Sequence, residues 1–276
     1  MVAGLPALFF DTTRLAATLV EWKGQLKEDL HPSDYTLMES FFLRYDNRNI
    51  HQLLTGKPGE WDPLGNYSKE QVEEVIDLLK DEDTDPESLD FPLYLSRHIR
   101  AFKADMPLFA DKTWENQLSL LYFDHLKDIG NPFIRDWYAY ELDLTNIVTA
   151  LSCRKHQVDI RNQLVGENEI TEKLIRSNAR DFGISNEFPL LESVLRAGEE
   201  EDFMEREKKY DLVKWKYLDD KVFFHYFTIE IIFTFVVKLE IISRWLNLDK
   251  NTGEKLFRDL VGQIKTTYSF PEEFTI

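Results

Sequence analysis

Apolar residues recur every three or four positions along most of this chain, which is the spacing of one face of an α-helix. Capping residues and breakers mark where each helix should begin and end. The expected helices start at Thr12 or Thr13, at Ser33 and at Ser68, and continue over 91–104, 113–129, a central segment after Pro132, 168–178, 188–196, a segment opened by 198–202, 219–246 and 252–267. The pattern therefore predicts an all-α fold.

Between these helices, two stretches are expected to be loops. Residues 56–65 contain three Gly and two Pro, and residues 81–90 contain six acidic side chains. Residues 269–276 are expected to form an extended strap. If the chain folds as two lobes, the break at Gly130-Asn131-Pro132 or the loop near residue 165 would separate them. We expect a single all-α domain over 1–276, in which two lobes would be an N-terminal helical repeat over 1–130 and central and C-terminal helical repeats over 131–276.

The central helix carries polar side chains within an otherwise apolar surface. Its apolar positions form one face, and a neighbouring face holds Asp143 and Asn146, with Arg154 further along. We expect this helix to be buried, so that these polar groups need hydrogen-bond partners on other helices. The alternative is a core helix whose few polar side chains extend to the surface.

An earlier segment matches the central helix without a gap. When Phe42–Leu54 is laid on Ala139–Leu151, the two segments share the pattern D-x-x-N-I. The equivalent pairs are Asp46 with Asp143, Asn49 with Asn146 and Ile50 with Ile147. Chance can produce such a short match, but a duplicated helical unit also explains the agreement of the apolar positions around it. A duplication predicts that each Asp caps or bridges to a neighbouring helix at an equivalent place.

The most apolar segment is Val222–Val237, a candidate membrane span. It is short for the roughly 20 apolar residues that a bilayer requires, and it contains His225 and Glu230. We therefore interpret it as part of a buried helix.

Composition narrows the classes of partner. Hydrophobic residues make up 43% of the chain, while Gly and Pro number only 11 and 10, a balance that favours long amphipathic helices. A net charge of −17 disfavours binding to nucleic acid or anionic lipid and would attract a basic partner towards the chain.

Cys153, the only cysteine, cannot form an intramolecular disulfide, which fits a reducing compartment. The N-terminal residues lack a basic, apolar leader, and we interpret them as mature sequence.

The sequence offers little sign of catalytic chemistry. It contains no Gly-rich phosphate loop, nucleophile elbow, H-E-x-x-H motif or Cys pair. Glu28–His31 resembles half of a di-iron motif but runs into Pro32, and the aspartates of 81–85 lie in a loop. We predict no catalytic, cofactor or metal residues. Two alternatives stay open: an all-α enzyme with a buried carboxylate site, and a generic acidic adaptor protein.

The central helix also carries a family resemblance. Tyr138–Lys155 resembles the signature helix of the V/A-type ATPase C (also called d) subunit, in which E-x-D-x-x-N-I is followed by an Arg-Lys pair. The chain also resembles, at Val2–Pro6 and Leu142–His156, a bacterial family of unknown function encoded beside V-type ATPase genes.

This resemblance implies an all-helical protein of repeated bundles that sits as a socket between the central shaft and the membrane rotor ring. The residues that match the family's helix and its repeat are expected to hold the architecture: Glu141, Asp143, Asn146, Ile147, Arg154 and Lys155, with Asp46, Asn49 and Ile50. A third repeat would fall at Lys238–Arg244, which lacks the Asp and Asn.

The function that follows is that of a non-catalytic central-stalk subunit in a V-type rotary ATPase, which couples ion or proton transport to rotation. Its expected partners are the shaft and rotor-ring subunits, with no nucleic acid and no direct insertion into the membrane. Its expected location is cytoplasmic, peripheral to the inner membrane through the complex.

Overall fold

Residues 1–81 and 83–248 are described by a computed structural model, and they form ten α-helices, two short 3-10 helices and no strand. The helices are α1 (Leu19–Asp29), α2 (Pro32–Thr55), α3 (Lys69–Leu78), α4 (Leu93–Lys103), α5 (Trp114–Leu126), α6 (Pro132–His156), α7 (Glu169–Arg176), α8 (Leu191–Gly198), α9 (Phe203–Val222) and α10 (Ile229–Asn247), with 3-10 turns η1 (Val2–Gly4) and η2 (Pro86–Ser88). The predicted all-α class is confirmed.

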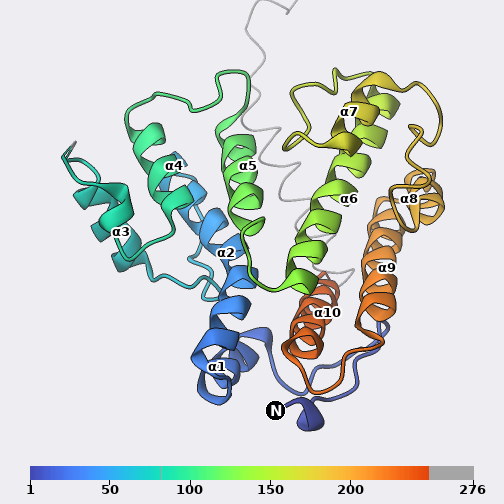
Figure 1. Cartoon of the computed structure of the whole chain (residues 1–276), viewed down its shortest axis with the longest axis horizontal. Helices are drawn as coiled ribbons and strands as arrows, with labels where there is room; N and C mark the ends of the chain where they lie inside the picture. The colour runs from blue at the N-terminus through green and yellow to red at the C-terminus, as the bar shows by residue number, and fades with distance from the viewer. Residues whose placement is uncertain (82, 249–276) are drawn as a thin grey trace, which may run out of the picture.

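Helices α2 to α5 lie on one side of the molecule and α6 to α9 on the other, as Figure 1 shows. Helix α10 connects the two sides, because it packs against α1, α6 and α9. Trp22 of α1 meets Phe235 of α10 edge to face, with ring centroids 4.8 Å apart. One connected apolar core draws side chains from both sides. The division into two lobes at residue 130 stays a prediction.

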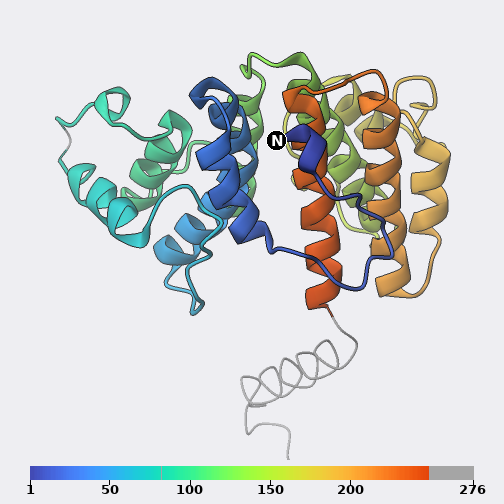
Figure 2. The same ribbon diagram turned by 90° about the horizontal axis from the view of Figure 1, so that it is seen from below.

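The start of the first helix was predicted too early. Helix α1 begins at Leu19, where Thr18 accepts a hydrogen bond from the Glu21 N–H, and the Glu21 carboxylate accepts one from the Thr18 N–H in return. This capping box places the N-cap at Thr18, six residues after Thr12. Residues 5–17 instead form an extended N-terminal segment beside α10 and α9, visible in Figure 2. In this segment Phe10 packs edge to face on Trp215 of α9.

The single helix predicted over 219–246 is also wrong. Helix α9 ends at Val222 and α10 begins at Ile229. Between them Phe227 adopts a left-handed backbone (φ 54°), which rules out one continuous helix through this segment. The apolar segment Val222–Val237 is thus a turn followed by the first part of α10. Among the described residues, none of the helices has the length and apolar character needed to cross a bilayer.

Other predicted features are confirmed. Helix α2 ends at Gly56, whose positive φ of 64° terminates the helix. Ser68 and Gln71 form the predicted capping box of α3, and α6 begins after the predicted break at Gly130-Asn131-Pro132, with Asn131 as its cap. The helix expected over 252–267 and the strap after it lie outside the described residues.

Candidate functional site

Asn49 of α2 holds the backbone of the following loop with both ends of its amide. Its Nδ2 donates to the Asp62 carbonyl (3.0 Å), and its Oδ1 accepts from the Asp62 N–H (2.9 Å). Asn49 is only 2% exposed. A loop backbone has no helical partner for these groups, so the asparagine satisfies a donor and an acceptor that burial would leave unpaired.

Asn146 of α6 makes the same two bonds to a different loop. Its Nδ2 donates to the Val165 carbonyl (2.8 Å), and its Oδ1 accepts from the Val165 N–H (2.9 Å). Asn146 is 1% exposed. The two asparagines that share the D-x-x-N-I pattern therefore do the same physical work on α2 and on α6.

The aspartate of each pattern contacts the start of the next short helix. Asp46 Oδ1 accepts from the Tyr67 N–H (3.1 Å), one residue before the α3 cap. Asp143 Oδ1 accepts from Nδ2 of Asn168 (2.7 Å), which is itself the cap of α7. We call Asp46 and Asn49 with their loop the α2 clamp, and Asp143 and Asn146 with theirs the α6 clamp.

The two aspartates differ in their surroundings. Asp46 is buried, whereas Asp143 is half-buried, so the expectation of a helix buried all round is wrong at that position. Burial raises the pKa of Asp46 to about 6, although the backbone N–H donors beside it act in the opposite direction. Burial also raises the pKa of Asp143. Lys23 of α1 adds to the α2 clamp, because its ammonium donates to the Leu64 carbonyl (2.8 Å).

Gly65 allows the loop of the α2 clamp to approach this closely. A Cβ at this position would lie 2.6 Å from Asp46 Oδ1 and 3.0 Å from Asn49 Nδ2. The first distance is shorter than real Cβ contacts and the second is tight, so a side chain here would displace the Asp46 carboxylate. From the sequence, Gly65 was only one of the Gly and Pro residues that predicted a loop over 56–65.

Glu141 lies on another face of α6 and joins three helices. Both of its oxygens accept hydrogen bonds from the Arg44 guanidinium of α2 (3.3 and 3.0 Å), and the Lys214 ammonium of α9 lies 3.7 Å from it. Burial alone would raise the pKa of Glu141, but Arg44 and Lys214 outweigh it and hold the pKa below its usual value. The sequence did not identify Arg44 or Lys214, because both approach from helices distant in the chain.

Arg154 and Lys155 lie apart from both clamps, at the exposed end of α6. The prediction that Arg154 is part of a buried helix is wrong, because the last turn of α6 extends beyond the core. Its guanidinium stacks on Phe182, 3.8 Å from the ring centroid, and donates to the carbonyls of Ala179 (2.9 Å) and Ser177 (3.2 Å). It therefore fastens the segment after α7. Lys155 forms no ion pair with any residue the structure describes.

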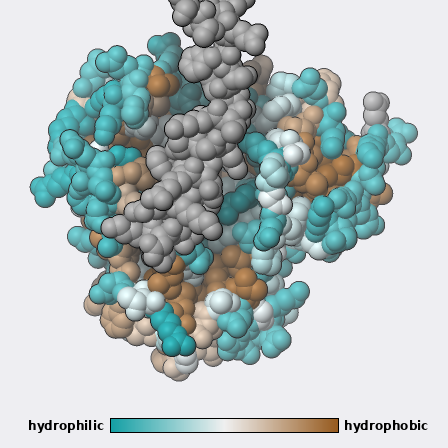
Figure 3. Space-filling model, turned by 180° about the vertical axis from the view of Figure 1, so that it is seen from behind, coloured by the Kyte–Doolittle hydropathy of each residue, from teal (hydrophilic) through white to brown (hydrophobic). Residues whose placement is uncertain are grey.

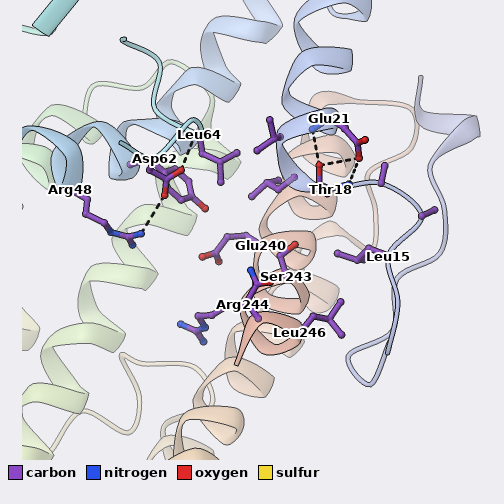
Figure 4. Close-up of a pocket in the computed structure, with 16 residues that line it drawn as sticks. Leu15, Thr18, Glu21, Arg48, Asp62, Leu64, Glu240, Ser243, Arg244 and Leu246 are labelled. Atoms are coloured by element: carbon purple, nitrogen blue, oxygen red, sulfur yellow. Dashed lines mark hydrogen bonds and ion pairs between the residues drawn. The ribbon is translucent and has the colours of Figure 1, made fainter. Parts of the chain in front are cut away.

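A groove of about 530 Å³ is lined by residues 15–21 at the start of α1, by α2 with the loop after it, and by α10, as Figure 4 shows. Arg48 and Asp62 form an ion pair (3.6 Å) on one wall. On the opposite wall, Glu240 and Ser243 of α10 have the three-residue spacing of the Asp and Asn in each clamp. The buried Ser243 Oγ has no hydrogen-bond partner among the described residues.

The described residues do not bring three potential metal ligands of the His, Cys, Asp or Glu type together. The fold and these contacts define an all-α protein in which long helices hold the loops that follow them. Residues 1–268 match the family described as "Protein of unknown function (DUF2764)", and the chain belongs to that family. Comparisons with curated proteins and with solved structures found no significant match.

Removal of Arg44 should destabilise the fold through the charge left on Glu141. We expect Arg44→Met to lower the free energy of unfolding by about 3 kcal/mol, since Lys214, 3.7 Å away, would leave the buried carboxylate only partly compensated. Arg48→Met is the matched control, one turn along α2, where the side chain is 67% exposed and the loss should be below about 1 kcal/mol. Urea denaturation measures both, and equal losses would show that Glu141 does not depend on Arg44.

Gly65→Ala should disrupt the α2 clamp. We expect a loss of about 2 kcal/mol, because the added methyl would displace buried hydrogen-bonding groups. Gly24→Ala serves as the control, since nothing lies within 4 Å of a Cβ there, and alanine in a helix interior should leave stability equal or higher. If thermal unfolding shows no difference between the two variants, the close approach at Gly65 is not required.

Asp46 should give the stability a specific pH dependence. Its pKa is about 6 in the folded chain, above the 3.8 of an ordinary aspartate, so the folded chain binds this proton more tightly than the unfolded chain. The contribution of Asp46 to the free energy of unfolding is therefore complete below pH about 4 and is lost as the pH rises through about 6. Asp46→Asn removes the titration.

The unfolding free energy of the unaltered protein, relative to Asp46→Asn, should fall by up to about 3 kcal/mol between pH 4 and pH 7. Denaturation series at several pH values measure this difference. A difference that is constant with pH, or that grows as the pH rises, would contradict the raised pKa of Asp46.

Proposed function

We propose that this chain is a non-catalytic subunit of a V-type rotary ATPase that couples the central shaft to the membrane rotor ring. The observation that carries the proposal is the pair of clamps, because Asn49 and Asn146 make the same two backbone bonds from the same place in D-x-x-N-I. That motif is the one that resembles the V/A-type ATPase C subunit. We infer a cytoplasmic location at the membrane from the same resemblance.

The order of the elements supports a duplicated unit. Helix α2 has 24 residues and α6 has 25, and each is followed by a clamped loop and then by a short helix, α3 or α7. We propose that the two segments are copies of one helical unit, as repeated bundles require. Glu240 and Ser243 would mark the corresponding place on α10.

A side-chain contact between α2 and α6 supports the same inference. The alignment that pairs Asp46 with Asp143 also pairs Arg44 with Glu141, and these two side chains are bonded to each other. Two copies of a unit related by an approximate twofold axis bring equivalent positions into contact in this way. A buried salt bridge at that place would fix how the copies dock.

The physical properties suit a mechanical role. A subunit that transmits torque has to keep its shape, and a close-packed core with paired internal charges resists deformation. Both Glu141 oxygens are engaged by Arg44, and the lowered pKa of Glu141 keeps it ionised, which disfavours a role as a general acid. The net charge of −17 would steer the chain towards basic faces of its partners.

Co-purification tests this function. An affinity tag on this chain in its own cells should recover the catalytic, shaft and ring subunits of the rotary ATPase in fixed proportion to it, as measured by quantitative mass spectrometry. The same tag on an abundant acidic protein of similar size controls for adhesion by charge. Recovery of this chain without the ATPase subunits would overturn the proposal.

A further inference from the structure

The turn between α9 and α10 holds four aromatic side chains away from the rest of the molecule. Phe223, Phe224, Tyr226 and Phe227 are 66%, 82%, 70% and 77% exposed. The turn lies at the lower end of the molecule in Figure 1. Figure 3, from behind, shows a mostly hydrophilic surface with hydrophobic residues gathered in a few places, one of them at this end.

Such a group of exposed rings needs an explanation. Single exposed apolar residues are normal on a folded protein, but contiguous ones mark surfaces that another molecule covers. Each ring carries a large apolar area that gains free energy when it leaves water. Phe223 and Phe224 also meet edge to face, with centroids 4.9 Å apart, so they present one continuous apolar surface.

Polar contacts beneath the rings hold the turn in this shape. Asn131, the cap of α6, donates from Nδ2 to the Glu230 carboxylate (2.7 Å), whose other oxygen lies 3.5 Å from His225 Nδ1. The His225 ring packs edge to face on Phe133 of α6 (5.2 Å). His225 therefore faces inward while its aromatic neighbours face outward. An element already held in its binding shape loses little entropy when it docks.

The charge of the whole chain indicates what kind of surface covers the turn. Beside the rings the charges nearly cancel, because Asp219 pairs with Lys238 and Asp220 precedes Lys221, whereas the whole chain carries −17. This overall charge opposes an anionic lipid surface. It favours an apolar socket edged by Lys or Arg. The cytoplasmic faces of membrane proteins combine apolar surface with an excess of Lys and Arg.

We propose that residues 223–228 form a preformed docking element that inserts its aromatic side chains into an apolar, basic-edged socket on the cytoplasmic face of a membrane protein. This inference rests on the function proposed above, which makes that membrane protein the rotor ring. It adds the surface of this chain that makes the contact.

The test uses the full-length chain and three surfaces: the purified rotor ring of the same cell's rotary ATPase in phosphatidylcholine nanodiscs, empty nanodiscs of the same lipid, and the soluble catalytic head with its shaft. Interferometry measures binding to each. Phe224→Ser/Tyr226→Ser removes two exposed rings. Met106→Ser/Leu108→Ser is the matched control, because it removes exposed apolar side chains from the loop between α4 and α5 at the opposite end of the molecule.

We expect the unaltered chain and the control variant to bind ring nanodiscs equally, and Phe224→Ser/Tyr226→Ser to bind them at least about tenfold more weakly. Equal binding of that variant to the ring would overturn the docking role of the turn and leave the proposed function standing. Binding to empty nanodiscs that depends on the two rings would replace the protein socket by lipid. Binding only to the head with its shaft would overturn the choice of partner. If the unaltered chain binds none of the three, the proposed function falls with this inference.

A second pair of variants separates the shape of the turn from the presence of the rings. Glu230→Gln keeps the bond from Asn131 possible but removes the charge that faces His225, whereas Glu230→Ala removes both contacts. If the turn is preformed, Glu230→Ala should weaken binding to ring nanodiscs several-fold more than Glu230→Gln, with the aromatic residues unchanged. Equal binding by both variants would show that the polar contacts do not position the rings.

Discussion

The fold depends on two asparagine side chains that pair with loop backbone. Asn49 and Asn146 each pair with one N–H and one C=O of a loop that has no helical partner for them, at the half-buried Asp62 and at the buried Val165. Long helices followed by irregular loops would otherwise bury unpaired polar groups, at a cost of about 1–3 kcal/mol for each group. The amide ties each loop to the helix before it, which sets where α3 and α7 begin. The neighbouring aspartates complete this connection.

The ion pair of Arg44 with Glu141 fixes a different relation, that between α2 and α6 themselves. A buried charge pair contributes little net stability compared with apolar packing, but it tolerates few alternative arrangements, since a small shift leaves a charge unpaired. Lys214 adds α9 to the same contact. A protein that transmits force between two partners benefits from such a contact. Sliding of α2 along α6 would have to separate the ion pair, and the cost of doing so opposes the movement.

The sequence predicted most helices because their apolar spacing and caps are local signals, as at Ser68 and Gly56. It failed where local signals conflict. The capping box of Thr18 with Glu21 starts α1 later than the apolar spacing suggests, and the left-handed Phe227 divides a segment whose composition reads as one helix. The D-x-x-N-I pattern identified the clamp residues but not their partners. Arg44, Lys214 and Asn168 could not be found, because only folding brings distant segments into contact.

A cryo-electron microscopy map of the rotary ATPase, isolated through a tag on one of its other subunits, would show whether this chain joins the shaft to the ring. We expect density for this chain between the two, with α2 and α6 related by an approximate twofold axis and the turn of 223–228 against the ring. A complete and active enzyme whose map holds no density for this chain would contradict this expectation.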